Sequence, residues 1–329
     1  MTQHQLPNVL RRLNGEDDAA QPVTAASSGT VEPTGGGGKL GERLVSAGLL
    51  TAEQVQSVIE LQKRSGVRFG EAAIQLGYVT ERDMQIALSE QFNYATALIS
   101  HPTVGASLAI AHDPFGREAE AIRQLRAEIS LRLDGQSNFS ISIVSANDGD
   151  GKSYVAASLA IAYSQSGQRV LFIDADLRGS GNDLFQLQEG PGLSTMLAGR
   201  DAHAAGMPVP GFPLLHVLSA GPRPPNPTEM LGAPAMRRFI GQFQDSFDVI
   251  VVDTPAANRS ADAQLIASQT DVCLVVVRQD ATLVEDFRQV QERMRRAGAQ
   301  LIGSVYNGHD AERSPGKAQP RWRKWLGRR

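Results

Sequence analysis

The segment VSANDGDGKSY at residues 144–154 places the strongest constraint on how this chain can fold. It follows the apolar run SISIV, which predicts a strand, and it precedes a predicted helix. Small residues in such a turn let successive backbone N–H groups point inward, and the start of the helix adds partial positive charge. The segment therefore predicts a loop that binds the phosphates of a nucleotide.

Two side chains at the end of this loop have chemistry suited to a nucleoside triphosphate. Lys152 is expected to reach the β and γ phosphates, and the hydroxyl of Ser153 is expected to bind Mg²⁺. Ala146 stands where the common eight-residue pattern has its first glycine. The loop alone is therefore a moderately specific signal, and the assignment needs support from elsewhere in the chain.

Two other apolar runs end in acids and supply that support. The run VLFIDADLR ends in Asp174 and Asp176, and the run VIVVDTP ends in Asp253. In a parallel sheet, ligands lie at the carboxyl ends of the strands, so these acids should gather near Lys152 and Ser153. A divalent cation would remove the repulsion between them. An ordinary solvated acid is a reasonable alternative for one of the three, but a poor one for all three together.

The second half of the chain alternates between strand-like and helix-like segments. From Phe139 onward, six apolar runs are separated by segments with helical spacing, and residues 118–132 predict a helix before the first run. This alternation predicts the α/β class, with a mostly parallel sheet that is covered by helices on both faces. Residues 113–308 are thus expected to form one phosphate-loop domain.

An internal repeat precedes this domain. Residues 39–62 and residues 68–91 are two units of 24 residues separated by five, with matching glycines, threonines and glutamines. Thr51 with Gln54, and Thr80 with Asp83, have the spacing of a helix capping box. The repeat predicts a small all-α domain over residues 39–92, in which each unit is a helix, a turn and a second helix.

Composition predicts the general class of the protein and the segments that lie outside the two domains. Of the 329 residues, 41% are apolar and 20% are charged, with a net charge of −3. This composition predicts a globular protein and no nucleic-acid partner. We expect a flexible leader at residues 1–38, a linker at residues 93–112 and a basic tail at residues 309–329. Cys273 is the single cysteine, which fits a reducing cytoplasm, and no apolar run approaches the roughly 20 residues that span a bilayer.

The phosphate-loop segment and its companions resemble a known family. SANDGDGKS, LFIDADLR, VIVVDTP and GPRPPNPTEML together are similar to the motifs of bacterial tyrosine kinases that accompany polysaccharide chain-length regulators. The likeness is to the soluble exopolysaccharide type, which belongs to the deviant P-loop ATPases. It covers roughly residues 113–307. It implies ATP and Mg²⁺ as cofactors and a membrane chain-length regulator as partner, which would hold the protein at the cytoplasmic face of the inner membrane.

The resemblance implies a role for each site residue. Lys152 would stabilise the transferring phosphoryl group, Ser153 and Asp176 would hold Mg²⁺, Asp253 would act on the metal, and Asp174 would accept the proton of an incoming hydroxyl. Together with Asn307 at the end of the last predicted strand, the expected nucleotide-binding set is Asn147, Asp148, Gly149, Asp150, Gly151, Lys152, Ser153 and Tyr154.

A helix before the loop carries a further family pattern. Glu120, Arg123 and Arg126 fit an E-x2-R-x2-R spacing, which in the family makes contacts between subunits of a ring. A solvated helix face with pairing between residues three apart is the alternative. The resemblance therefore implies a homo-oligomer.

Two features depart from the family. The tyrosines are Tyr78, Tyr94, Tyr154, Tyr163 and Tyr306, so the tail lacks the tyrosine cluster that a neighbouring subunit usually phosphorylates. The acceptor then lies on another protein, or the ATP cycle serves as an assembly switch. Asn147 stands where cell-division and plasmid-partitioning relatives carry an additional lysine, which favours the kinase branch.

The repeat resembles the N-terminal domain of type II secretion and pilus ATPases, one subtype of which binds cyclic di-GMP. Relatives with the same fold dock proteins instead, so a docking module or plain helical packing stays open. The resemblance implies that apolar residues such as Leu40, Leu44 and Phe69 pack on the bases. The residues that the resemblance assigns to cyclic di-GMP are Lys39, Leu40, Gly41, Gly48, Gln62, Arg68, Gly70, Gly77 and Gln91.

These patterns favour an ATP-dependent tyrosine kinase that regulates exopolysaccharide polymerisation, export and chain length under cyclic di-GMP control. One rival is a non-kinase ATPase switch that positions cargo on a membrane. A second is a cyclic di-GMP adaptor with a vestigial nucleotide site. The tail PRWRKWLGRR mixes basic residues with two tryptophans. It predicts contact with an anionic membrane surface, binding to the cytoplasmic end of a membrane partner, or a plain soluble segment.

Overall fold

The computed structural model describes residues 37–80, 83–84, 87, 104–179, 184–186, 190–200, 206–232 and 234–308. The chain divides into two compact units, Met1–Gln91 and Phe92–Arg329, and each is described by itself. The predicted leader and the basic tail lie outside the described residues, except that residues 37–38 belong to the first helix. Among the described residues, none of the helices combines the length and apolar character needed to cross a bilayer.

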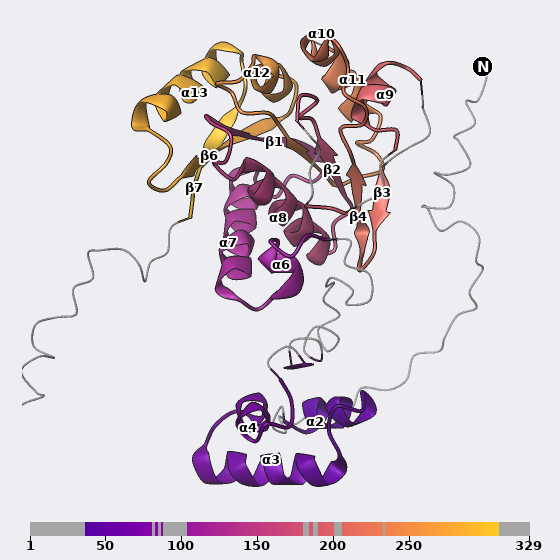
Figure 1. Ribbon diagram of the computed structural model, residues 1–329, viewed down its shortest axis with the longest axis vertical. Helices are drawn as coiled ribbons and strands as arrows, with labels where there is room; N and C mark the ends of the chain where they lie inside the picture. Colours follow the sequence, from indigo (N-terminus) through magenta and orange to yellow (C-terminus); the bar gives the residue numbers. More distant parts are fainter. Residues whose placement is uncertain are drawn as a thin grey trace, which may run out of the picture. The chain divides into compact units, whose positions relative to one another are not determined.

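The smaller unit is helical (Figure 1). Its turns at Gly48 and Gly77 both have φ 70°, a left-handed conformation that suits glycine. Thr51 and Gln54 form the predicted capping box, and Thr80 and Asp83 exchange the equivalent bonds. Its helices are α2 (Gly37–Ser46), α3 (Ala52–Ser65) and α4 (Phe69–Gln75), and residues 83, 84 and 87 are also helical.

Close helix packing explains two of the repeated glycines. A Cβ atom at Gly41 would lie 3.2 Å from side-chain atoms of Phe69 and Val55, and one at Gly70 would lie 3.3 Å from the sulfur of Met84. Neighbouring helices therefore approach each other at both positions. The buried core of this unit consists of Leu40, Leu44, Leu50, Val58, Phe69, Ala72, Ala73, Val79, Met84 and Ala87.

The larger unit contains a seven-stranded sheet in the order β3-β4-β2-β5-β1-β6-β7. All neighbouring pairs are parallel except β3 with β4, so the predicted α/β class with a mostly parallel sheet is confirmed. The short β3 was not predicted. The strands are β1 (Phe139–Ser145), β2 (Val170–Asp174), β3 (Met207–Val209), β4 (Phe212–Leu218), β5 (Val249–Asp253), β6 (Val272–Arg278) and β7 (Leu301–Asn307).

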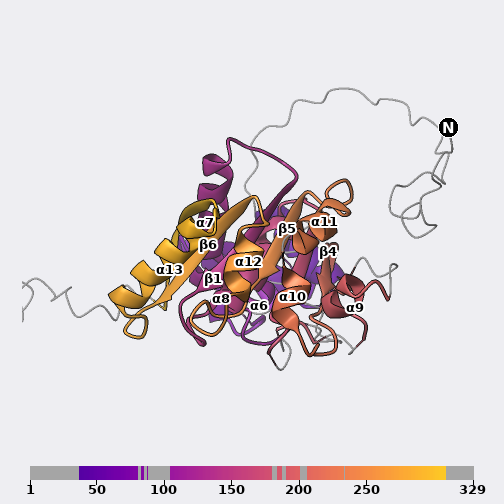
Figure 2. The ribbon, with the colours of Figure 1, turned by 90° about the horizontal axis from the view of Figure 1, so that it is seen from above.

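Helices cover both faces of this sheet, and the views in Figures 1 and 2 show the layers from two directions. Every residue of β1, β2 and β5 is buried, as expected for parallel strands that are covered on both faces, although β1 carries serines among its apolar residues. One face packs against α6 (Ala109–His112), α7 (Arg117–Arg132) and α8 (Lys152–Gln165). The other face packs against α9 (Leu193–Leu197), α10 (Pro227–Leu231), α11 (Ala235–Gly241), α12 (Asp262–Ala267) and α13 (Val284–Arg296).

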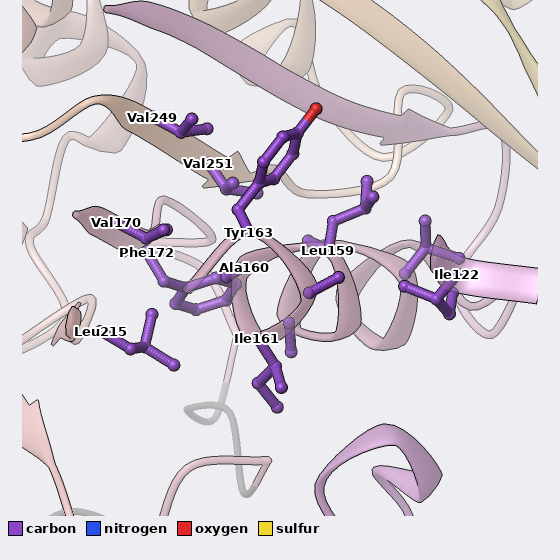
Figure 3. Close-up of a cluster of buried hydrophobic side chains, with 14 of the residues drawn as sticks. Ile122, Leu159, Ala160, Ile161, Tyr163, Val170, Phe172, Leu215, Val249 and Val251 are labelled. Carbon is purple, nitrogen blue, oxygen red and sulfur yellow. The ribbon is translucent and has the colours of Figure 1, made fainter. Parts of the chain in front are cut away.

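Helix α8 is buried along most of its length, and this burial fixes the position of the loop before it. Figure 3 shows its residues Leu159 and Tyr163 between strand residues such as Val251 and a residue of α7, Ile122. The ring of Tyr163 also meets the edge of Phe139 in β1 at a centroid distance of 5.9 Å. A helix enclosed on all sides cannot shift without opening the core, so its N-terminus is a rigid support.

The predicted linker over residues 93–112 differs from the structure in its described part. Val104, Leu108 and Ile110 are buried in the core beneath α8, and Val104 pairs with Phe185 in an isolated bridge. These apolar side chains carry no helical or strand periodicity, which is why the sequence pattern did not assign them to the domain. Residues 93–103 lie outside the described part of the chain.

Candidate nucleotide-binding site

The parallel register brings the predicted strand-end residues to one edge of the sheet. Strand β5 lies between β1 and β2, and Asp253 at its end is in register with Ile143 of β1 and Asp174 of β2. The loop that follows β1 therefore emerges beside both acids. The loop after β1, the end of β2 at Asp174 and the end of β5 at Asp253 thus meet at the N-terminus of α8, as the sequence predicted.

The loop between β1 and α8 is shaped by two glycines. Gly149 has φ 83° and Gly151 has φ 94°, both in the left-handed region that strains other residues. Gly151 is the N-cap of α8, and a Cβ atom there would collide with the side-chain nitrogen of Asn307 in β7. The left-handed conformation favours glycine at this position, and a larger residue would also have to displace the Asn307 amide from the Asp150 carbonyl.

Asp150 holds the loop in shape. Its carboxylate accepts hydrogen bonds from the N–H of Asn147 at 2.9 Å and from the hydroxyl of Thr282 at 2.8 Å. Its backbone carbonyl accepts a bond from Nδ2 of Asn307 at 3.0 Å. The side chain is buried, so its carboxylate is used inside the protein and is directed away from a phosphate. Asp150 belongs to the predicted nucleotide-binding set, and the structure gives its side chain a supporting role.

Further hydrogen bonds hold the first part of the phosphate loop in place. Nδ2 of Asn147 donates to Asp286 at the start of α13 at 3.1 Å, and Oδ1 of Asn147 accepts from Asn258 at 3.0 Å. Arg278, at the end of β6, donates to the carbonyl of Gly149 at 2.9 Å. Sequence reasoning missed these supports and Thr282. Asn258 follows the end of β5, and Arg278 and Thr282 lie at and after the end of β6, so their place at strand ends was the signal in the sequence. Only the strand order shows that β5 and β6 both border β1.

Charge is concentrated where the three strands end. Lys152 is buried with 8% of its surface exposed, as are Asp174 with 5% and Asp253 with 1%. Burial raises the pKa of Asp174 to about 7, and the neighbouring charge of Asp253 adds to the shift. Burial also raises the pKa of Asp253 to about 6, although the Lys152 ammonium and the Ser153 hydroxyl oppose the shift. The structure therefore brings these four predicted residues together in a water-poor site.

Asp176 lies at the mouth of this group. One of its carboxylate oxygens accepts the N–H groups of Arg178 and Gly179 at 3.1 and 2.9 Å. Asp174 in turn accepts the N–H of Asp176 at 3.0 Å. These bonds orient both acids toward the phosphate loop from a tight turn, so their placement is set by the backbone.

The donor set fits Mg²⁺ held together with nucleotide phosphates. Among the described residues, no group of three or more histidines, cysteines or acids is placed to hold a metal ion by itself. Mg²⁺ commonly keeps waters and takes one or two protein oxygens plus phosphate oxygens. Ser153, Asp176 and Asp253 supply oxygens of this kind, and the buried ammonium of Lys152 adds a positive charge beside them that suits phosphate oxygens. These residues therefore suit a magnesium–nucleotide complex.

Tyr154 is a second member of the predicted nucleotide-binding set whose side chain points away from the phosphate loop. Its hydroxyl donates to Glu118 in α7 at 3.2 Å, and the side chain packs against the core. Burial raises its pKa to about 12, with the Glu118 charge adding to the shift. The place of Tyr154 directly after the phosphate loop predicts contact with a nucleotide. However, Tyr154 is one residue beyond Ser153 along α8, and this step turns its side chain toward α7.

A buried network explains two further sequence motifs. Nε of Arg178 donates to Asp262 at 2.6 Å, and its Nη2 donates to Thr228 at 2.6 Å. Thr228 also donates to Asp262, which is 1% exposed. The arginine of LFIDADLR is thereby tied to the helix formed by PTEML and to the start of α12. This network holds the Asp176 turn in place.

The predicted oligomer-contact residues make bonds within the chain. Arg123 pairs with Glu120 at 2.8 Å, and Arg126 donates to the carbonyl of Ala162 in α8 at 2.8 Å. Glu120 is the more exposed partner of the pair, at 54%. The two arginines are thus oriented by their own chain, as in the alternative of a paired helix face, and subunit contact stays a prediction.

The predicted cyclic di-GMP residues are divided between core and surface. Leu40 and Gly41 are buried, as are Leu44 and Phe69, so the expected packing of these apolar side chains on bases is wrong for this conformation. They fill the core between the short helices instead. Gln91 and the side chain of Lys39 lie outside the described residues. The residues that remain at the surface, fully or in part, are Gly48, Gln62, Arg68, Gly70 and Gly77.

The fold and the loop together define a P-loop NTPase domain. A family model described as the NUBPL iron-transfer P-loop NTPase, of the ParA class, matches residues 137–313. The chain therefore belongs to this class of P-loop NTPases. Within it, the chain belongs to the family of bacterial tyrosine kinases, as the following relatives show.

Tyrosine-protein kinase YwqD of Bacillus subtilis is 31% identical over 197 residues, which are 60% of this chain and 83% of YwqD. Tyrosine-protein kinase Etk of Escherichia coli K12 is 32% identical over 209 residues, which are 63% of this chain and 29% of Etk. The chain thus covers less than a third of the length of Etk.

Solved structures agree with this membership. The kinase domain of Etk has a TM-score of 0.61 and 28% identity, over 68% of this chain and 94% of that domain. The chimerical protein CapA2B2 has a TM-score of 0.57 and 28% identity, over 68% of this chain and 97% of that protein. The α/β architecture of the larger unit is therefore that of the kinase domains.

The role of Gly151 can be tested with a matched glycine at the other end of α8. Gly167 also has a left-handed φ, 89°, but a Cβ atom there meets nothing within 4 Å. Both Gly→Ala changes carry the backbone penalty of about 1–2 kcal/mol, and Gly151→Ala adds the collision with Asn307. We expect Gly151→Ala to lower the free energy of unfolding by more than Gly167→Ala, measured by urea denaturation. Equal losses would show that Asn307 does not enclose the loop.

Proposed function

We propose that this protein is an ATP-dependent tyrosine kinase that regulates the polymerisation, export and chain length of an exopolysaccharide. The observation that carries the proposal is the convergence of Lys152, Asp174 and Asp253 at the start of α8, with Asp176 beside them. Its membership of the bacterial tyrosine kinase family supports the same activity.

Each residue has a task that its environment suits. The N–H groups of the loop and the Lys152 ammonium bind the phosphates, and Lys152 stabilises negative charge as the phosphoryl group moves. Ser153 and Asp176 hold Mg²⁺ and Asp253 orients it, and the ion when bound neutralises charge on the phosphates. Asp174, whose pKa is raised to about 7, is suited to accept the proton of an attacking hydroxyl near neutral pH.

The partner follows from the same family. We propose that a membrane chain-length regulator binds this protein and holds it at the cytoplasmic face of the inner membrane, with several copies of the chain in a ring. The exposed carboxylate of Glu120 and the adjacent Arg123 support a contact of that kind. The predicted membrane contact of the basic tail is part of this proposal.

A non-kinase ATPase switch is the second candidate. The match to the ParA family model favours it, because that model is described as an iron-transfer P-loop NTPase and not as a kinase. In this case the same residues bind and hydrolyse ATP, and the acceptor of the phosphoryl group is water. The identity of the acceptor therefore separates the two functions.

We also propose that the small unit responds to cyclic di-GMP. Its two turns at Gly48 and Gly77 are exposed and share a left-handed conformation, and Arg68 is exposed before α4. Exposed glycines allow close approach of a ligand to the backbone, and arginine recognises phosphate and guanine edges. The buried residues of the predicted cyclic di-GMP set do not support the proposal, so the support comes from these exposed residues.

The kinase proposal predicts a large loss of phosphotyrosine formation for each of two substitutions. Lys152→Ala is expected to lower phosphotyrosine formation at least about 100-fold, because a stabilising charge is lost. Asp174→Asn is expected to lower it about 10²–10⁴-fold, because an amide cannot accept the proton. Incubation with labelled ATP followed by mass spectrometry measures both, and Lys63→Ala and Asp245→Asn, at exposed positions, serve as matched controls. Phosphate release from ATP without phosphotyrosine in the wild type would favour the switch.

The exposure of the tyrosines predicts where self-phosphorylation occurs in the described part of the chain. Tyr163 is fully buried and Tyr154 is bonded to Glu118, whereas Tyr306 is 57% exposed on the edge strand β7. We expect label from ATP on Tyr306, transferred between two copies, and its loss in Tyr306→Phe but not in Tyr154→Phe. Label confined to Tyr78 or Tyr94, or to a partner protein, would contradict this assignment.

Cyclic di-GMP control is tested by direct binding. We expect the chain to bind cyclic di-GMP in isothermal titration calorimetry and Arg68→Ala to weaken binding about 10-fold, the effect of losing a charge-assisted hydrogen bond. Arg64→Ala, at an exposed position of α3, should bind as the wild type does. Absence of heat with wild-type protein would leave docking or helical packing as the role of the repeat.

A further inference from the structure

One cation at the candidate site has no place in the roles described so far. Arg259 lies six residues after Asp253, in the turn that follows β5. Its Nη1 is 3.7 Å from Oδ1 of Asp148 in the phosphate loop and 3.7 Å from Oδ2 of Asp176. The guanidinium therefore bridges the loop and one of the acids that suit Mg²⁺.

The backbone before Arg259 is attached to the phosphate loop. The N–H of Ala257 donates to the carbonyl of Ser145 at 2.9 Å, and the N–H of Asn258 donates to the carbonyl of Ala146 at 3.0 Å. Arg293 of α13 donates in turn to the carbonyl of Ala257 at 2.8 Å. The turn is thus fixed beside the first residues of the loop, and the Arg259 side chain extends from a rigid base.

The ion pairs of Arg259 are of a kind that exchanges readily. The Arg259 side chain is 42% exposed and that of Asp148 is 61% exposed. Exposed ion pairs contribute about 0–1 kcal/mol, and at 3.7 Å the groups attract without a short hydrogen bond. A stronger anion that enters the site can therefore take over the guanidinium.

The balance of charge shows when that exchange occurs. Without a divalent cation, Arg259 offsets the repulsion between Asp176 and the neighbouring acids. A cation that binds Asp176 takes over this task, because a carboxylate oxygen prefers Mg²⁺ to a partly exposed guanidinium. The guanidinium then keeps Asp148 and has donors free for another partner within reach of the loop.

We propose that Arg259 binds the terminal phosphoryl group of a magnesium–nucleoside triphosphate and so distinguishes the triphosphate from the diphosphate. The planar guanidinium can donate two parallel bonds to phosphate oxygens, which lysine cannot do. It also adds a positive charge where negative charge is spread during phosphoryl transfer. This inference rests on the proposed nucleotide binding and extends it to a residue outside the predicted set.

Equilibrium binding of fluorescent ATP and ADP analogues tests the proposal on the full chain. With Mg²⁺ present, Arg259→Gln is expected to weaken ATP binding about 10- to 100-fold, the range for charge-assisted bonds, and ADP binding less than about threefold. Arg259→Lys should lie between Gln and the wild type. With Mg²⁺ removed by a chelator, Arg259 stays with Asp176, so Arg259→Gln and the wild type should bind ATP equally.

Controls separate this inference from the proposed function. Arg296→Gln removes an exposed arginine that pairs with Glu292 on α13 and should bind both nucleotides as the wild type does. Circular dichroism should show unchanged folding of Arg259→Gln, since its side chain is partly exposed. Equal weakening of ATP and ADP, or unchanged ATP binding with Mg²⁺, would overturn the inference alone. Failure of the wild type to bind either nucleotide would overturn the proposed function as well.

Discussion

The parallel pairing of β5 between β1 and β2 is the constraint on which the site depends. It places Asp253 beside Asp174 and beside the end of β1 in one register, so that the phosphate loop emerges next to two acids. A shift of one residue in either pairing would move Asp253 to the opposite face and remove it from Lys152. The three strands are buried on both faces along their whole length, and this burial holds the register.

Neighbouring groups offset only part of the free-energy cost of burying several charges at this site. Lys152 lies among the acids, and the raised pKa values of Asp174 and Asp253 show that burial and mutual repulsion remain partly uncompensated. A group that is not fully compensated in the protein alone is suited to bind a charged ligand. The loop itself is kept rigid by Asp150, Thr282 and Asn307, so little reorganisation is needed when a nucleotide enters.

The two units show glycine used for different physical reasons. In the small unit, Gly41 and Gly70 allow helices to approach, while the turn glycines supply a left-handed backbone. In the large unit, Gly151 meets both needs at once, because it is left-handed and faces Asn307. The repeated glycines are therefore consistent with plain packing as well as with a ligand. Those of the two turns are exposed, whereas Gly41 is buried and Gly70 is exposed only in part.

The parts of this protein that depend on local chemistry can be predicted from neighbouring residues along the chain. Lys152 and Ser153 follow a strand and a glycine turn, Asp174 and Asp253 end apolar runs, and Thr51 caps a helix; each of these was read from adjacent residues and spacing. The α/β class followed from the alternation of such segments.

The tertiary structure alone decided which distant residues support the site. Thr282 and Asn307 reach Asp150 across 132 and 157 residues, because β6 and β7 lie on the side of β1 opposite to β5. Arg259 comes within 3.7 Å of Asp176 because β5 borders β2. It also turned Tyr154 toward α7 and buried Val104 and Ile110. Strand order and helix rotation arise from packing of the whole core, and periodicity along the chain carries no information about either.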